Sequence, residues 1–396
     1  MKTVVLAAGK GARMGPFTAS RPKGMIPVAN KPILEYVIAA LVENNLRDIV
    51  MVVGYQREGI MSYFDDGRRF GAKIEYVSQT KQMGTAHALW ETRAKLDGKF
   101  IVLNGSNIVD AHAVADLVRQ EEVPAVLITE SDEPTKYGSV IEEDGYLLRL
   151  IEKPTEPVSN LINTGMYILD EEFFKLGEPL IKAGKFDIPS ILQNIAEQGR
   201  VKVARTEGQW ADALYPWDLL GLNASALVGT GDSRAGRIEK DVHFQGKVLI
   251  GEGSIIHSGT YIGGPTVIGE GCEIGPQVVI KPSTSIGMNV RIGPFTHVEN
   301  SILMDHVSIG PGSIVSSSVV GKGSNLGTRF TSLTGPASVE VEGEWHRVET
   351  IGALLGDDVT MAGGIVVEPG AIVGTRCKVG AMVRVRGNVP NGSTVV

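Results

Sequence analysis

The feature that most constrains the fold is a repeat of six residues in the C-terminal part of the 396-residue chain. Aliphatic residues recur at every sixth position: Ile250, Ile256, Ile262, Ile268, Ile274, Ile280, Ile286, Ile292 and Val298. A helix needs a period of 3.6 residues and an ordinary strand a period of two. A strict period of six is typical of a left-handed parallel β-helix, whose coils have three six-residue sides with one aliphatic side chain pointing inward on each. A β-sandwich with regular turns would not keep one phase over nine repeats.

The repeat also sets the expected domain boundaries. More than half of the 49 glycines follow residue 240, as expected if glycine occupies the corners of the coils. The register slips near residues 304–309, and a non-repeating insertion at about 330–348 carries Trp345 and His346. We therefore expect an N-terminal domain at residues 1–228, a linker at 229–238 and a β-helix at 239–396.

The N-terminal part alternates short apolar runs with helical patterns. The runs that predict strands are residues 3–8, 48–53, 73–77, 99–104 and 125–129. The patterns that predict helices are residues 33–43, 85–95 and 111–120. Strand–helix alternation is typical of a Rossmann-like α/β domain with a mostly parallel sheet and crossover helices.

Composition excludes several classes of protein. The chain has 38 Lys+Arg and 45 Asp+Glu residues, a formal net charge of −7, so nothing favours nucleic acid or an anionic membrane as a partner. No apolar stretch approaches the length of a membrane-spanning helix. The two cysteines, Cys272 and Cys377, cannot form a disulfide framework or a cysteine-rich metal site. We expect a cytoplasmic protein.

A glycine-rich loop follows the first predicted strand and contains Gly9, Gly11 and Arg13, with Lys23 ten residues further on. Backbone amides of such a loop can approach phosphate oxygens, although turns need glycine in any case. The loop is not a Walker A motif, and Met14 occupies the last glycine position of the dinucleotide fingerprint. Two cations brought to one loop favour a triphosphate ligand.

These residues resemble the signature of the sugar-1-phosphate nucleotidylyltransferases, L-A-A-G-x-G-T/A-R followed by P-K. Later segments resemble that family's base-reading segment, sugar-phosphate pocket and metal-binding acid, in chain order: residues 79–86, 137–138, 152–154, 163–165 and 210–212. Joined to a β-helix, the whole chain resembles the GlmU-like archaeal and bacterial enzymes. In those enzymes the two domains are a uridylyltransferase and an acetyltransferase.

The resemblance implies a reaction and a set of residues for it. A sugar phosphate oxygen attacks the α-phosphorus of a nucleoside triphosphate in line, and pyrophosphate leaves. The implied catalytic residues hold the β/γ-phosphates, the α-phosphate and the sugar phosphate: Arg13, Lys23 and Lys153. The implied nucleotide-binding residues are Leu6, Ala7, Ala8, Gly9, Gly11, Gln79, Gln82, Gly84 and Thr85. The implied sugar-binding residues are Gly138, Glu152, Asn163 and Thr164. For Glu152 and Lys153, an exposed ion pair at a strand end is the alternative interpretation.

The expected metal site departs from the family pattern. Relatives carry an Asp in a segment like L-N-G-D, which binds Mg²⁺ together with the acid that corresponds to Asp212. Ser106 stands at that position here. A neutral hydroxyl is a poor ligand for Mg²⁺, so we expect a weakened Mg²⁺ site at Asp212. The sequence alone does not distinguish a native Ser106 from an introduced change.

The β-helix departs from the family pattern as well. The acetyltransferase His of the archaeal enzymes falls at Pro311, a Tyr at Ile314 and a pocket Asn at Thr334. Proline cannot accept a proton as a general base must. We therefore expect no acetyl transfer, and oligomerisation remains as the role of the β-helix.

Two functions stay open from the sequence. The first is an enzyme that transfers a nucleotide from UTP or dTTP to a hexose- or N-acetylhexosamine-1-phosphate. The second is a silenced sugar-nucleotide-binding subunit that assembles with an active paralogue. The intact cations Arg13 and Lys23 favour the first, and Ser106 with Pro311 favours the second. The expected assembly is a homotrimer or a hetero-oligomer.

Overall fold

The computed structural model describes all residues from Met1 to Val396. The chain forms two compact units, each built from two stretches of sequence. The sheet unit contains residues 1–10 and 33–212, and the β-helix unit contains residues 11–32 and 213–396. None of the helices is long and apolar enough to cross a membrane.

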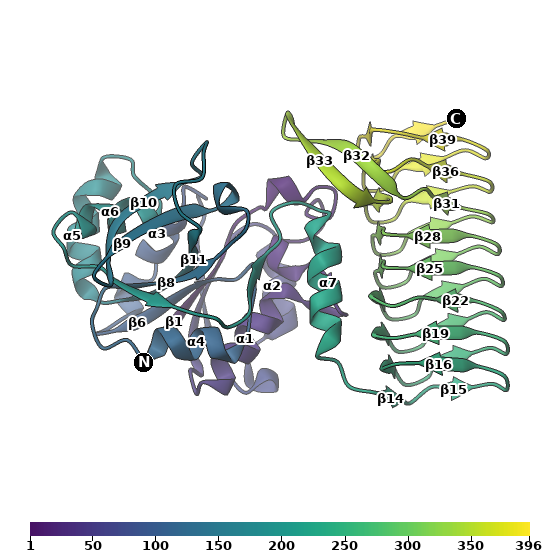
Figure 1. Cartoon of the computed structure of the whole chain (residues 1–396). Helices are drawn as coiled ribbons and strands as arrows, with labels where there is room; N and C mark the ends of the chain where they lie inside the picture. Colours follow the sequence, from purple (N-terminus) through teal and green to yellow (C-terminus); the bar gives the residue numbers. More distant parts are fainter. The chain divides into compact units, whose positions relative to one another are not determined.

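The sheet unit is built on a nine-stranded sheet (Figure 1). Its strands, in spatial order, are β5 (Lys73–Ser78), β4 (Asp48–Val53), β1 (Lys2–Ala7), β6 (Phe100–Asn104), β11 (Leu161–Leu169), β8 (Ala125–Glu130), β12 (Lys202–Arg205), β10 (Tyr146–Glu152) and β9 (Gly138–Glu143). The first four run parallel, as predicted. The remainder is mixed, because β11 follows the antiparallel hairpin β9–β10 instead of a crossover helix and pairs antiparallel with β6 and β8.

Helices cover both faces of this sheet. They are α1 (Ile33–Glu43), α2 (Arg57–Phe64), α3 (Thr85–Trp90), α4 (Ala111–Val118), α5 (Glu171–Lys182) and α6 (Ile188–Ala196). Helices α3, α5 and α6 pack together, as do α1 and α4. Strand β4 and helix α1 have the predicted bounds, whereas α3 ends at Trp90 and a separate 3₁₀ turn covers Arg93–Lys95. The predicted α/β architecture is confirmed.

The β-helix unit contains three parallel sheets, one for each side of the coil, as the six-residue period predicts. The first sheet contains β14 (Ser233–Arg234), β17 (Val248–Ile250), β20 (Thr266–Ile268), β23 (Thr284–Ile286), β26 (Ile302–Leu303), β29 (Val319–Val320), β34 (Leu354–Leu355), β37 (Ile372–Val373) and β40 (Asn388–Val389). The second contains β15 (Arg237–Ile238), β18 (Ile255–Ile256), β21 (Glu273–Ile274), β24 (Arg291–Ile292), β27 (Ser308–Ile309), β30 (Asn325–Leu326), β35 (Thr360–Met361), β38 (Lys378–Val379) and β41 (Thr394–Val395). The third contains β16 (His243–Gln245), β19 (Tyr261–Gly263), β22 (Val279–Ile280), β25 (His297–Glu299), β28 (Ile314–Ser316), β31 (Thr331–Ser332), β36 (Val366–Val367) and β39 (Arg384–Val385).

The register slip is a shortened side of the coil. Ile268 pairs with Ile286, but Ile286 pairs with Leu303, one residue fewer than a full coil of eighteen. The slip therefore begins before the predicted segment, at a corner where Asn300 has a φ of 43°. The aliphatic residues keep pointing inward across it and form one continuous buried core along the coils.

The predicted insertion is a two-stranded hairpin, β32 (Gly335–Val341) and β33 (Glu344–Ile351), which projects from the column of coils (Figure 1). The tip of this hairpin is Glu342 and Gly343, both with positive φ. Trp345 is exposed, whereas the ring of His346 packs against Tyr215, with the ring centroids 4.3 Å apart.

One side of the β-helix carries a second apolar layer that the six-residue pattern does not predict. Because side chains alternate along a strand, Val267, Ile302 and Val319 point outward from the first sheet, and all three are buried. Helix α7 (Asp218–Val228), which the sequence places in the N-terminal domain, runs beside this face (Figure 1). It belongs to the β-helix unit because Leu227 packs against Val267 and Ala29.

Candidate active site

The candidate site lies where the parallel strands of the sheet unit end. Leu6 and Ala7 close β1, and the next residue, Ala8, accepts a hydrogen bond from the amide of Tyr55 at 3.2 Å. The carbonyl of Leu6 accepts one from the amide of Gly105 at 2.9 Å. These bonds join the ends of β1, β4 and β6, and ligands of open α/β sheets bind in the crevice at this edge.

The predicted base-reading segment is ordered by Gln79. This side chain is only 4% exposed, and its Nε2 donates to the carbonyl of Gly84 at 3.1 Å and lies 3.1 Å from Nδ1 of His87. Thr85 accepts a hydrogen bond from the amide of Ile188 at 3.0 Å, so its hydroxyl fixes the start of α6. The sequence analysis predicts that Gln79 contacts the base. In the structure the same side chain also fixes the backbone of the segment at Gly84.

Gln82 lies on the exposed side of the same segment. Its Nε2 reaches the backbone beside Gly54, where an added Cβ would be 2.9 Å from that nitrogen. The same hypothetical Cβ would be 2.8 Å from the carbonyl oxygen of Ala8. The predicted base-reading segment therefore adjoins the turn that follows β1.

Gly84 has no room for a side chain. Its φ is 153°, and a Cβ at this position would lie 2.3 Å from the carbonyl oxygen of Phe186. A backbone oxygen cannot move aside as a flexible side chain can, so Gly84→Ala is expected to displace the segment and weaken nucleotide binding by about tenfold or more. Titration of the nucleotide by calorimetry would measure this. Gly59→Ala on α2, where a Cβ meets nothing within 4 Å, is the control, and equal affinities for the two variants would contradict the prediction.

The predicted sugar pocket brings Gly138 and Glu152 together. They are register partners in the β9–β10 hairpin, and a Cβ on Gly138 would lie 2.8 Å from a carboxylate oxygen of Glu152. Although Glu152 as a whole is accessible, desolvation of its carboxylate raises the pKa of this group, with Asp187 adding to the effect and Lys153 opposing it. Lys153 follows with a φ of 43°, and its amide donates to the carbonyl of Tyr137 at 3.0 Å. The turn thus places a carboxylate and a cation at consecutive positions.

Asn163 and Thr164 are tied into the sheet. The amide of Asn163 donates to the hydroxyl of Tyr167 at 2.8 Å and accepts from the amide of Gly165 at 2.9 Å. Thr164 is 1% exposed, and its hydroxyl donates to the carbonyl of Leu127 at 2.7 Å. The hydroxyl of Thr164 is therefore used inside the protein, which leaves only its backbone for the predicted contact with a sugar.

Two aromatic residues border this pocket that the sequence analysis did not single out. Tyr137 and Trp210 meet edge to face with ring centroids 5.3 Å apart, and Nε1 of Trp210 donates to the carbonyl of Thr164 at 2.9 Å. Both lie within the matched family segments, and that position was the available signal. Their ring faces provide apolar surface of the kind on which sugars and bases stack.

The pairing of two short strands shows which residues adjoin Ser106 at the expected metal site. Strand β7 (Asn107–Val109) pairs antiparallel with β13 (Trp210–Asp212), with Asp212 opposite Asn107, and Ser106 immediately precedes this pair. Directly opposed residues of an antiparallel pair have their Cβ atoms about 5 Å apart. Asn107 is 3% exposed, and its Oδ1 has no hydrogen-bond partner. Mg²⁺ accepts one or two carboxylates completed by water and substrate phosphates, so these residues fit an ion held chiefly by the triphosphate.

No stronger metal site replaces the expected one. The structure has no group of three or more His, Cys, Asp or Glu side chains able to hold a metal ion. Asp110, the other carboxylate near Ser106, caps α4 by accepting from the amide of Ala113 at 2.9 Å. Asp212 therefore stays the predicted carboxylate ligand.

The rest of the signature loop lies in the β-helix unit. Gly11 has a φ of 65°, and a Cβ there would lie 2.8 Å from Cβ of Lys23. The stem of Lys23 therefore packs directly on the glycine loop, and Thr18 closes the turn by donating to the carbonyl of Gly11 at 2.9 Å. Arg13 lies 3.5 Å from Glu342 of the hairpin. Because both side chains are exposed, this ion pair contributes little to stability, and Arg13 can leave Glu342 to bind a phosphate.

The positions expected for acetyl transfer carry no general base. Pro311 lies at a corner of the coil, and its carbonyl accepts from the amide of Arg329 at 2.9 Å. Ile314 is exposed on β28 and pairs in register with His297 on the preceding coil. The imidazole of His297 lies 3.2 Å from Glu299, as expected of a polar face residue.

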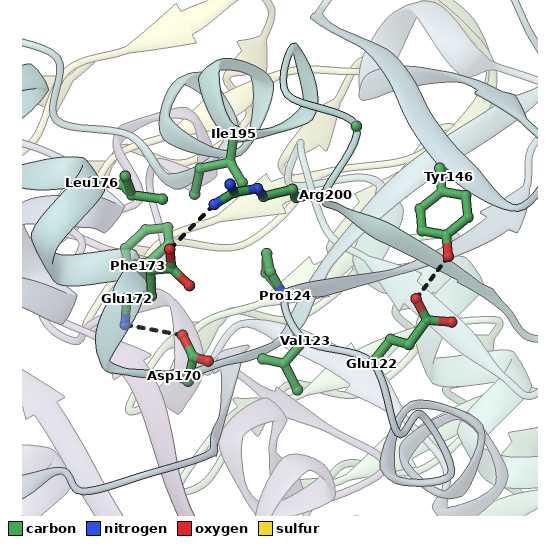
Figure 2. Close-up of a pocket in the computed structure, with 11 residues that line it drawn as sticks. Glu122, Val123, Pro124, Tyr146, Asp170, Glu172, Phe173, Leu176, Ile195 and Arg200 are labelled. Atoms are coloured by element: carbon green, nitrogen blue, oxygen red, sulfur yellow. Dashed lines mark hydrogen bonds and ion pairs between the residues drawn. The ribbon is translucent and has the colours of Figure 1, made fainter.

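A pocket of about 270 Å³ lies at the other end of the sheet, where β8 begins and β11 ends (Figure 2). Its rim is held by Tyr146, which donates to Glu122 at 2.7 Å, and by Arg200, whose Nη1 lies 3.3 Å from Glu172. None of the predicted site residues lines it. This pocket therefore takes no part in the candidate site.

Both parts of the chain match models of known protein families. The model of the nucleotidyl transferase family matches residues 2–224, and that of the GMPPB C-terminal domain matches residues 262–370. The chain is 35% identical over 392 residues to the bifunctional protein GlmU of Methanococcus maripaludis, covering 96% of this chain and 93% of the relative. It is 33% identical to the low-salt glycan biosynthesis nucleotidyltransferase Agl11 of Haloferax volcanii, covering 83% and 94%.

Among solved structures, that of a candidate glucose-1-phosphate thymidylyltransferase from Bacillus anthracis is similar, with a TM-score of 0.54 and 26% sequence identity. The match covers 59% of this chain and 98% of that one. The fold and the ordered motifs define a nucleotidyltransferase domain joined to a hexapeptide β-helix. The chain belongs to the sugar-1-phosphate nucleotidyltransferase family, as the sequence motifs predicted.

Proposed function

We propose that the chain transfers a nucleotidyl group from UTP or dTTP to a hexose- or N-acetylhexosamine-1-phosphate and releases pyrophosphate. The observation that carries the proposal is the packing of the Lys23 stem on Gly11, within the glycine loop that leaves β1. This loop offers backbone amides and a cation to one phosphate chain. Relatives include a UTP–glucose-1-phosphate uridylyltransferase, AglF of Haloferax volcanii, 37% identical over 229 residues, which is 55% of this chain and 93% of AglF.

In this reaction the protein chiefly positions groups and neutralises charge. Arg13 binds the β- and γ-phosphates, and Lys23 stabilises the charge that develops at the α-phosphate. Lys153 holds the sugar phosphate in line with the α-phosphorus. Asp212 would hold a Mg²⁺ ion, which would supply further neutralisation of the phosphate oxygens.

The sugar is held by the β9–β10 turn and the start of β11. Glu152 accepts hydrogen bonds from sugar hydroxyls, and Gly138 leaves room for that carboxylate. Asn163, already bonded to Tyr167, has one amide hydrogen and one lone pair left for the sugar. Gln79, Gln82, Gly84 and Thr85 shape the base subsite.

A second candidate is favoured by Ser106. A subunit that keeps the cations but lacks the metal carboxylate binds nucleotide and sugar nucleotide without turning them over. It would assemble with an active paralogue through the β-helix and form a hetero-oligomer. Large apolar side chains that are exposed on the β-helix, among them Phe295, Ile314 and Met382, support an interface there.

The test is pyrophosphate release by the purified chain with Mg²⁺ and each pairing of UTP or dTTP with glucose- or N-acetylglucosamine-1-phosphate. Turnover above about 1 s⁻¹ with one pairing is expected of an ordinary enzyme and would also identify the base and the sugar. Nucleotide binding without release in any pairing would support the silenced subunit. Neither binding nor release would contradict both candidates.

A further inference from the structure

The signature loop depends on the β-helix for its shape. Residues 11–32 contain only two 3₁₀ turns and the two-residue strands β2 (Pro27–Val28) and β3 (Lys31–Pro32). A segment this long with so little structure of its own is ordered by what anchors it. The anchors therefore decide where the phosphate-binding groups lie.

The charged anchor is a buried carboxylate at a corner of the β-helix. Asp357 is 5% exposed, and its Oδ1 accepts from the amide of Lys322 on the preceding coil at 2.9 Å. Its Oδ2 accepts from both the Ser20 hydroxyl and Nη2 of Arg21. Nη1 of Arg21 lies 2.8 Å from the sulfur of Met304. One carboxylate thus joins two coils to two consecutive residues of the loop.

Further contacts fix the end of the loop. Nδ2 of Asn30 donates to the carbonyl of Ile286 at 2.6 Å. Asn223 on α7 accepts from the amide of Ala29 and donates to the carbonyl of Ser283, both at 2.9 Å. These contacts are neutral and lie six or more residues beyond Lys23, whereas Arg21 of the charged anchor lies two residues before it.

The charged anchor is two residues from the predicted catalytic cation. Pro22 stands between Arg21 and Lys23 with its φ locked at −70°, and Lys23 then begins a 3₁₀ turn. The stem of Lys23 packs on Gly11, so the anchor, the rigid proline and the glycine all constrain the position of this side chain. A shift of Arg21 is passed to Lys23 with little flexibility between them.

We propose that Asp357 is a positioning residue for nucleotide binding, acting through Ser20 and Arg21 on Lys23. The inference rests on the proposed function, since it concerns the same loop, and it assigns the β-helix a task in the nucleotidyl reaction. The charge of the anchor is essential to it. A buried aspartate that loses its cation, or a buried arginine that loses its anion, keeps an uncompensated charge and is driven to rearrange towards water.

The test compares Asp357→Asn with a matched control in the intact chain. Asparagine keeps the size and the bond to the Lys322 amide but loses the charge that holds Arg21. Asp305→Asn is the control, because Oδ1 of Asp305 accepts from the amide of Met288 at 2.9 Å in the same way, between two other coils. Asp357→Asn is expected to raise the KM and the Kd for the nucleotide by about 10- to 100-fold while the KM for the sugar phosphate stays unchanged.

Hydrogen–deuterium exchange over residues 17–26 gives a readout that needs no activity. These amides are expected to exchange faster in Asp357→Asn and at the wild-type rate in Asp305→Asn. Arg21→Gln approaches the anchor from the loop and leaves the coils intact, so it is expected to reproduce the effect even if Asp357→Asn folds poorly. The double variant is expected to lose no more than either single one.

Unchanged loop exchange and nucleotide affinity in both Asp357→Asn and Arg21→Gln would overturn the inference. So would equal effects of Asp357→Asn and Asp305→Asn. A wild-type chain that binds no nucleotide would instead contradict the proposed function. In that case the exchange of residues 17–26 still decides whether Asp357 orders the loop.

Discussion

Replacing Lys23 by alanine is expected to lower kcat/KM for nucleotidyl transfer by about 100- to 1,000-fold, the loss typical of removing one preorganised group that stabilises developing charge. The loss is expected in both kcat and the KM for the nucleotide, because Lys23 binds the α-phosphate and also opposes the charge that grows there as pyrophosphate leaves. The stem of Lys23 packs on Gly11, which limits the motion of this side chain before the reaction and so reduces the reorganisation needed during it. Steady-state kinetics with both substrates varied would measure the split.

The control for this variant is Lys99→Ala. Lys99 is exposed and donates to the carbonyl of Glu121 at 2.6 Å, beside the start of β6 and away from the strand ends that carry the site. The change of net charge is the same, so general electrostatic effects cancel in the comparison. An equal loss in the two variants, or a loss of less than about tenfold in Lys23→Ala, would contradict the proposed role.

The fold was largely predictable because its two patterns are simple. The six-residue period requires a coil with one inward residue on each side, and the structure places those aliphatic residues in one buried core. The bounds of α1 follow from an uninterrupted apolar helix pattern. The antiparallel β11 was not predicted, because nothing in an apolar run specifies its direction. The outward apolar face at Val267 and Val319 was also missed, since a search for inward residues ignores the alternate position.

The candidate site was predictable as a set of motifs but not as a network. Motif order named Gln79, Asn163 and Thr164, whereas their hydrogen bonds show that each also holds backbone in place. Such double roles depend on partners far away in sequence. Asp357 illustrates the same limit, since it lies more than 300 residues from Arg21 and belongs to a corner of the repeat that carries no nucleotidyltransferase signature. Only the folded chain brings these two residues together.

Ser106→Asp is expected to raise kcat at limiting Mg²⁺ by about 100-fold and to lower the Mg²⁺ concentration needed for half-maximal rate. The added carboxylate would stand beside Asn107, whose strand partner is Asp212. Two carboxylates bind a hard cation far better than one carboxylate and a hydroxyl, and a bound divalent ion stabilises phosphoryl charge by several kcal/mol, each 1.36 kcal/mol being tenfold in rate. Without Mg²⁺, two close carboxylates repel, so the variant is also expected to unfold at a lower temperature in chelator than in Mg²⁺.

Ser106→Asn separates charge from size in this experiment. Asparagine matches aspartate in volume and supplies a neutral oxygen, so it is expected to leave both kcat and the Mg²⁺ dependence near those of the wild type. Equal gains in the two variants would mean that Ser106 limits the site by its shape and not by its missing charge. A silent wild type restored by aspartate alone would identify the chain as a subunit whose nucleotidyl site was switched off at one ligand, because Arg13, Lys23 and Lys153 would then be shown to be in working order.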